Sequence, residues 1–299
     1  MLNILMAFSL TDFWNRVFVF ENYGRLFDML SQSILAGAVL GIIGGFAGTF
    51  IMMRDHAFAV HGIAEMSFAG AALFLLLGYD VVTGSLVGSI ASAVLIGLMG
   101  VKHDESNSVI GALMPFGLGL GILFLSLYEG RSANKFSLLT GQIVSVDSAQ
   151  LTEMVVGAVI VVLALLAIWR PLTFASVDPE VARAKGVPMR GLSLTFMVIV
   201  GIATALSVQV VGSLLVLALL ITPAAAALQI TASPVKALIW SVIFAELAIV
   251  GGILLALAGS LPISPYVTTI SFLIYIICKI IGLARRRFSS SGRREAVTA

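Results

Sequence analysis

Charge is scarce in this chain of 299 residues: Asp, Glu, Lys and Arg make up 11% of it, against about 25% in soluble proteins. Hydrophobic residues make up 60%. The stretch 191–235 has no charged residue, which leaves room for two membrane-crossing helices of about 20 residues and a tight turn. Spanning strands are excluded because the apolar runs are continuous rather than alternating. The composition predicts an all-α polytopic integral membrane protein.

Cysteines and common catalytic motifs are also missing. The single cysteine, Cys278, excludes an intramolecular disulfide and a cysteine metal cage. The chain has no G-x-x-x-x-G-K-[ST] phosphate loop, no H-E-x-x-H zinc motif and no G-x-S-x-G nucleophile elbow. It is therefore not expected to be an enzyme or to cradle ATP itself. Residues 1–29 lack a basic leader and a small-residue cleavage site, so we expect a retained amphipathic segment rather than a signal peptide.

Apolar runs bounded by polar clusters predict about nine transmembrane helices. Eight or ten remain possible because the 191–230 stretch is hard to divide. Together they form a single transmembrane domain, residues 30–284. The predicted helices are 30–52, 57–77, 81–100, 109–128, 151–169, 191–208, 212–230, 235–258 and 266–283.

Basic residues set the orientation of these helices. With a cytoplasmic C-terminus, thirteen Lys and Arg residues fall on the inner side and four on the outer side, which is the positive-inside bias of membrane proteins. Nine spans then put the N-terminal segment 1–29 outside. The basic tail 285–299 is cytoplasmic, and its composition is typical of disorder.

Two ionisable residues, His61 and Glu65, lie one helical turn apart inside an apolar stretch (residues 57–78) that is otherwise suited to cross a bilayer. Positions i and i+4 share one helix face. An imidazole and a carboxylate offer the nitrogen and oxygen ligands that suit zinc, manganese or iron. Ionisable groups at membrane depth are costly and usually line a transport pathway. The pair indicates metal contact; a hydrogen-bonded pair that locks two helices together is the alternative.

Other polar residues near the predicted helices carry weaker signals. Glu246 is alone in the eighth predicted helix, where a gate, an outer partner of the metal ligands and a helix-packing role are all open. The polar residues at the inner helix ends, among them Arg54, Asp55 and His56, are interpreted as solvated helix ends rather than a metal exit site. Glycines four residues apart, such as Gly37, Gly41 and Gly45, indicate close helix packing in lipid.

The inner loop 170–191 contains signals for a short helix. Asp178 is suited to the N-cap, Pro179 to the first helical position and Gly186 to the C-terminal cap. Glu180 near the start and Lys185 near the end suit the helix dipole. A helix this short is marginal in water, so the rest of the protein or a docked partner should hold it.

The segment VDPEVARAKGV resembles the cytoplasmic coupling helix of permease subunits in ATP-binding-cassette importers, with its E-x-A-R-x-x-G pattern. Residues 210–228, 106–127 and 136–146 resemble the branch of that family that imports manganese, zinc or iron. The likeness runs from about Leu35 to Gly282. It implies that Asp178, Glu180, Ala182, Arg183 and Gly186 contact a separate ATPase subunit.

That family usually has a G-D-A-x-S-H-x-x-x-P-G stretch in its second helix, whose Asp and His bind the metal. Aligned on Gly70, this chain has His61 where the family has Asp and Glu65 where it has His, with Ala69 in place of the Pro. The ligand types are exchanged, while spacing and face are kept. In the family's homodimer, two copies of the pair would supply four ligands near the midplane.

The resemblance implies a non-enzymatic permease subunit of an ATP-driven importer, which moves a divalent transition metal into the cytoplasm of a bacterium across its cell membrane. Its expected partners are ATPase subunits, an extracellular or periplasmic metal-binding protein, a second copy of itself and membrane lipid; nucleic acid is not among them. No permanently bound cofactor is expected beyond the transported ion. The outer segment 129–150 is the expected contact for the binding protein. Alternatives are a proton-driven secondary transporter and a permease for haem, siderophores or cobalamin.

Overall fold

The computed structural model describes residues 30–99, 103–130, 146–257 and 263–298, together with Gly24 and Phe27, and this part of the chain contains helices and no strands. The predicted segment 1–29 lies almost wholly outside the described residues, as does most of the outer segment 129–150. The first helices are α4 (Ser31–Met53), α5 (Ala57–Leu76), α6 (Val81–Met99) and α7 (His103–Leu127). They are followed by α9 (Ser148–Ala167), α10 (Trp169–Val177), α11 (Pro179–Ala184), α12 (Met189–Leu220), α13 (Thr222–Ile230), α14 (Pro234–Ala256) and α15 (Ile263–Thr298).

Eight helices among the described residues are long and apolar enough to cross a membrane, and the further apolar helix Leu215–Ile230 is shorter. This agrees with the predicted range of eight to ten. The division of the 191–230 stretch was predicted a few residues too early. The first helix there continues to Ser213, and the chain is non-helical at Gly212, with φ 79° and ψ 161°. Hydropathy could not locate this break because the sequence is apolar on both sides of it. Pro223 lies in the first turn of α13, where the missing N–H of a proline is tolerated.

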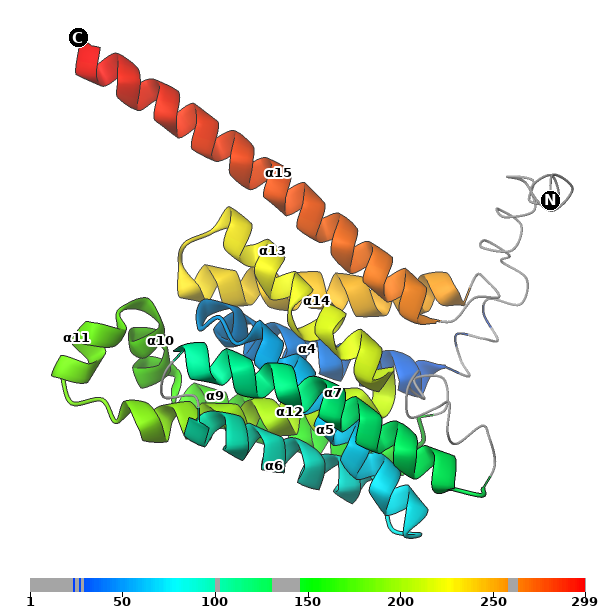
Figure 1. Cartoon of the computed structure of the whole chain (residues 1–299). Coiled ribbons are helices and arrows are strands. Elements are labelled where there is room, and N and C mark those ends of the chain that lie inside the picture. Colours follow the sequence, from blue (N-terminus) through cyan, green and yellow to red (C-terminus); the bar gives the residue numbers. More distant parts are fainter. Residues whose placement is uncertain are drawn as a thin grey trace, which may run out of the picture.

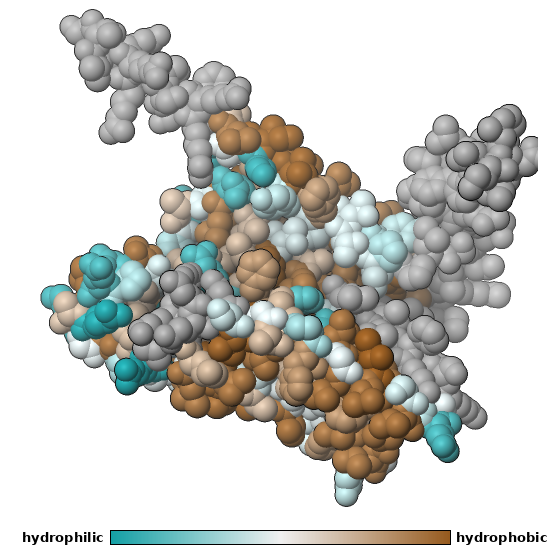
Figure 2. Space-filling model, viewed as in Figure 1, coloured by the Kyte–Doolittle hydropathy of each residue, from teal (hydrophilic) through white to brown (hydrophobic). Residues whose placement is uncertain are grey.

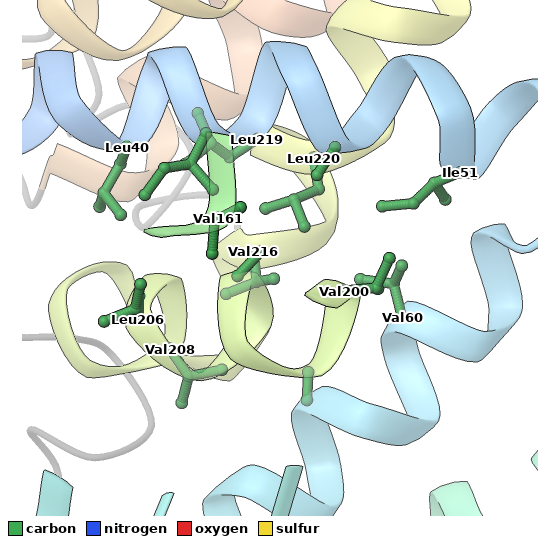
Figure 3. Close-up of a cluster of buried hydrophobic side chains, with 14 of the residues drawn as sticks. Leu40, Ile51, Val60, Val161, Val200, Leu206, Val208, Val216, Leu219 and Leu220 are labelled. Atoms are coloured by element: carbon green, nitrogen blue, oxygen red, sulfur yellow. The ribbon is translucent and has the colours of Figure 1, made fainter. Parts of the chain in front are cut away.

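Helix α12 lies at the centre of the bundle. Figure 3 shows Val216, Leu219 and Leu220 of this helix near Val161, and Val200 beside Val60. Leu40 and Ile51 come from α4, Val60 from α5 and Val161 from α9, and all four are fully buried. Because α5 packs on this central helix, its position is set by the core of the protein rather than by lipid.

Glycines bring the helices beside α5 into backbone contact with it. A Cβ built on Gly117 of α7 would lie 2.9 Å from the backbone carbon of Glu65. On the other side, Gly70 of α5 meets the backbone of Gly84 and Gly88 in α6. Ser67 of α5 also shares a buried hydrogen bond, 2.6 Å between hydroxyl oxygens, with Ser85 of α6. Small residues at these positions allow the close approach that drives helix association in membranes.

The two ends of the bundle differ in character. In Figure 1, α10, α11 and the C-terminal end of α15 lie at the left, whereas the turn between α5 and α6 lies at the lower right. Figure 2 shows hydrophilic side chains around α11 and hydrophobic ones over much of the α6 and α7 flank. Helix α15 continues to Thr298 and so includes most of the basic segment 285–299, although the composition of that segment is typical of disorder. Extending an existing helix adds one hydrogen bond per residue, and Arg, Ala and Glu favour it.

Candidate metal site and the short helix α11

His61 and Glu65 lie within the regular part of α5, on one face, as the spacing predicts. The distance between His61 Nδ1 and Glu65 Oε1 is 4.0 Å, and the side chains are 31% and 4% exposed. Glu65 is therefore enclosed by the protein, while part of the His61 ring reaches the surface of the chain. An ion bound to Glu65 would still be accessible from the His61 side.

The distance within the pair bears on its chemistry. At 4.0 Å the two atoms are too far apart for a hydrogen bond, which needs about 2.7–3.2 Å. Two metal–ligand bonds of about 2.0–2.2 Å at the tetrahedral angle hold their ligand atoms about 3.4 Å apart, so the two side chains would have to approach each other by roughly half an ångström to ligate one ion. His61 Nδ1 and Glu65 Oε2 are buried and find no hydrogen-bond partner among the described residues. Buried polar atoms are usually satisfied, and an ion would satisfy both.

The ligand set of one chain is small. Within the described ranges, no group of three or more His, Cys, Asp or Glu side chains is positioned to hold a metal. Zinc sites usually have four ligands, and three protein ligands are the common minimum in open sites. A second copy of the chain, or oxygen donors of another kind, is required to complete coordination.

Glu246 lies elsewhere in the bundle. It is on α14 and packs against α4, where a Cβ built on Gly41 would lie 2.5 Å from its Oε1. That oxygen is buried and lacks a hydrogen-bond partner in the described part of the chain. Glu246 does not join His61 and Glu65 in one cluster within the chain. An outer-partner role would have to operate across a dimer, whereas gate and packing roles stay open.

The short helix predicted in the loop 170–191 is α11, and its caps form as the sequence indicates. The Asp178 side chain accepts a hydrogen bond of 3.0 Å from the backbone N–H of Val181, and Pro179 occupies the first turn. Gly186 has φ +83°, a conformation that side chains other than glycine rarely adopt. The N–H groups of Gly186 and Val187 donate to the carbonyls of Arg183 and Ala182, which is a Schellman motif.

Of the five residues predicted to contact the ATPase, four are exposed and one is buried in the protein. Ala182 is fully buried, whereas Asp178, Glu180, Arg183 and Gly186 face outward. Val177 and Val181 beside them are 65% and 44% exposed, although this end of the bundle is polar. These two apolar side chains lie beside the exposed residues that were predicted to contact the ATPase.

Sequence reasoning missed two features at this end. Helix α10 was taken as loop, because nine residues beginning with Trp-Arg-Pro carry no clear cap; its buried Leu172 and Ala175 reveal the inner face. Arg54 was expected to be solvated, yet its guanidinium lies 5.6 Å from the centre of the Phe196 ring and its Nε is buried. Burial lowers the pKa of Arg54, although arginine stays protonated at neutral pH.

An ionisable pair enclosed by membrane-length helices is the arrangement of a transport protein, because charged groups at that depth are kept where they face a pathway. The chain belongs to the ABC 3 transport family, whose model matches residues 26–282. It is accordingly a multi-pass membrane permease subunit, and ATP hydrolysis is carried out by a separate subunit.

Individual relatives agree with this family. The chain is 24% identical to the high-affinity zinc uptake system membrane protein ZnuB of Haemophilus influenzae, over 84% of this chain and 97% of ZnuB. It is 27% identical to the manganese transport system membrane protein MntC of Halalkalibacterium halodurans, over 76% of this chain and 78% of MntC. Among solved structures, PsaBC from Streptococcus pneumoniae in complex with Fab superposes with a TM-score of 0.75 at 25% identity, over 84% of this chain and 90% of that one.

Proposed function

We propose that this permease subunit moves a divalent transition-metal ion (manganese, zinc or iron) into the cytoplasm, and that His61 and Glu65 contact the ion. The observation that carries the proposal is the approach of His61 Nδ1 to Glu65 Oε1, 4.0 Å apart, in a bundle of membrane-length helices. His61 Nδ1 and the other carboxylate oxygen, Glu65 Oε2, are buried and have no hydrogen-bond partner among the described residues. Relatives named for zinc and manganese transport support it. Imidazole and carboxylate suit all three metals, so geometry and availability choose among them. The ion is the transported substrate, and no resident cofactor is required.

The proposed working unit is a homodimer in the cell membrane of a bacterium. Because the described residues of one chain bring only two ligands of the usual kinds together here, two copies of the pair facing each other would supply four. The exposed part of the His61 ring supports this, since it leaves a side of the pair open to a second chain.

The proposed energy source is an ATPase subunit bound at α11. An outward-facing capped helix with exposed Val177 and Val181 beside it supports this contact. A metal-binding protein would deliver the ion at the opposite end, with segment 129–150 as its expected contact. The thirteen-to-four distribution of basic residues supports a cytoplasmic C-terminus.

A proton-driven carrier is not favoured, because family membership ties the chain to ATP-driven transport. The chelate-importer alternative is also weaker. A solved structure described as a metal-chelate type ABC transporter in an inward-facing conformation is 16% identical with a TM-score of 0.69, which indicates a shared fold alone.

The direct test is uptake by proteoliposomes that contain the permease with its ATPase subunit and binding protein. Radiolabelled manganese and zinc should accumulate only with ATP inside, on the ATPase side. Accumulation driven by an imposed proton gradient without ATP would contradict the proposal.

Glu180→Lys and Gly186→Val should each abolish ATPase binding and uptake while membrane insertion stays normal. Retained ATPase binding and full uptake in both variants would remove α11 as the docking helix.

A further inference from the structure

Three aromatic rings from three helices meet beneath the α10–α11 segment. Phe50 of α4 lies edge-on to Trp169, the first residue of α10, with 5.0 Å between ring centres. Phe50 also lies edge-on to Phe196 of α12, at 6.4 Å. Phe50 and Phe196 are fully buried, so these contacts are made inside the protein and not at a lipid-facing surface. We refer to Phe50, Trp169 and Phe196 as the ring cluster.

The turn between α4 and α5 is fastened to the same cluster. The Arg54 guanidinium lies over the Phe196 ring at 5.6 Å, within the range of a cation–π contact, and the His56 ring lies 6.3 Å from Phe196. The turn itself is tight: Asp55 has φ 55°, and the backbone N–H of His56 donates to the Ile51 carbonyl at 2.9 Å. A non-glycine residue with positive φ is held there only when its surroundings fix it.

Both ends of this connection lead to sites described above. His56 is the N-cap of α5, and His61 follows five residues later on the same helix, an axial distance of about 7.5 Å. In the other direction, Trp169 begins α10, whose Leu172 is fully buried, and Asp178, which follows the last residue of α10, is the N-cap of α11. The ring cluster thus joins the proposed ATPase dock to the proposed metal helix through packed, rigid elements.

We propose that Phe196 and Arg54 are positioning residues that couple movement of the α10–α11 segment to α5 and its His61–Glu65 pair. This rests on the proposed function, because it assumes an ATPase at α11 and an ion at the pair. When the ATPase displaces α11, Trp169 moves Phe50 and Phe196, and the Arg54 contact carries the α4–α5 turn and the start of α5 with them. Neither residue touches the ion.

If Phe196 and Arg54 served only to pack the protein core, they would not need to be an aromatic ring and a cation. Aliphatic side chains of similar volume would fill an apolar core with little loss of stability. A half-buried guanidinium with an orphaned Nε would not be needed there. Coupling instead requires that the α4–α5 turn move together with the Phe196 ring. The contact of the Arg54 guanidinium with the face of that ring links the two.

The test measures metal ions imported per ATP hydrolysed in proteoliposomes, together with metal binding and ATPase binding by each variant. Phe196→Leu and Arg54→Met should keep both binding activities yet lower the ion-to-ATP ratio at least about five-fold, the lower end of typical coupling between sites. Arg54→Lys, which keeps a cation for the ring, should restore most of the ratio.

The matched control is Phe244→Leu, which removes a ring 5.4 Å from Trp240 on α14, outside the ring cluster. Its ratio should stay at the wild-type value. Wild-type ratios in Phe196→Leu and Arg54→Met, or an equal fall in the control, would overturn the coupling role. If Phe196→Leu does not fold, the ion-to-ATP ratios of Arg54→Met and Arg54→Lys test the coupling role: equal ratios in these two variants would overturn it. Absence of ATP-dependent metal uptake in the wild type would instead refute the proposed function itself.

Discussion

At the scale of single residues, the chemistry of the candidate site depends on one anionic oxygen and one neutral ring nitrogen. Glu65→Gln keeps size and hydrogen-bonding capacity but removes the charge that offsets a divalent ion. Uptake should fall by more than the roughly 10- to 100-fold that follows loss of a ligand's hydrogen-bond partner. A pair that only stabilised packing would tolerate the amide. Radiolabelled manganese and zinc uptake, normalised to the amount of permease in the membrane, distinguishes the two.

Two substitutions at His61 distinguish the effect of losing a metal ligand from the effect of changing the side-chain volume. His61→Asp supplies a new oxygen ligand and should retain more uptake than His61→Leu, which fills space without ligating. Uptake should also decline in acid, because metal binding needs a neutral imidazole and an ionised carboxylate. Wild-type rates in both Glu65→Gln and His61→Leu would leave no metal site at this position.

The pair was predictable from sequence because an i, i+4 spacing of ionisable residues in an apolar helix has few interpretations. The burial difference between Glu65 and His61 was not, since it depends on which neighbours cover each side of α5. The backbone contact made by Gly117 is one such neighbour, from a helix more than 50 positions away in the sequence. Arg54 was misjudged for the same reason: its partner Phe196 is distant along the chain.

At the scale of helices, the sequence predicted helix ends correctly where capping residues mark them clearly. Asp178, Pro179 and Gly186 fix α11 through cap geometry that involves only neighbouring residues, so its position was predicted closely. Helix α10 and the break in α12 were harder. Nothing in the charge-free stretch 191–235 marks Gly212 as a break except that it is a glycine, and Gly201 in the same helix shows no such break.

The break in α12 leads to a stability prediction. Gly212 has φ 79° and ψ 161°, a region open essentially to glycine, so Gly212→Ala should destabilise the protein by about 1–3 kcal/mol. Gly251→Ala is the control, because an added Cβ there would meet only Ile270 Cδ1, at 3.7 Å. The midpoint of heat-induced aggregation in detergent should drop for the first variant and hold or rise for the second. Equal midpoints would mean that α12 can become straight at no cost.

At the scale of the whole molecule, the two ends of the bundle should face opposite sides of the membrane. Tyr79 in the α5–α6 turn and Val177 at the end of α10 are 67% and 65% exposed, so cysteines at these positions should be equally reactive in detergent. In intact cells Tyr79→Cys should react with an impermeant maleimide, whereas Val177→Cys should need a permeabilised membrane. The native Cys278 is 4% exposed and should give little background. The reverse labelling pattern would invert the orientation and move α11 away from any cytoplasmic ATPase.

The largest-scale prediction concerns how many chains one ion requires. His61 and Glu65 are two ligands, and no third His, Cys, Asp or Glu joins them within the described part of one chain. If two copies complete the site, the purified complex should bind one metal ion per two permease chains at saturation. Binding of one ion per chain would instead mean that hydroxyl, amide or backbone oxygens of the same chain finish the coordination.

Equilibrium dialysis with radiolabelled zinc, with Glu65→Gln to subtract ions bound elsewhere, measures the ratio of bound ions to permease chains directly. A complex with one wild-type and one Glu65→Gln chain sharpens the comparison: a shared site should lose most of its affinity, whereas independent sites should retain half of the bound metal at unchanged affinity.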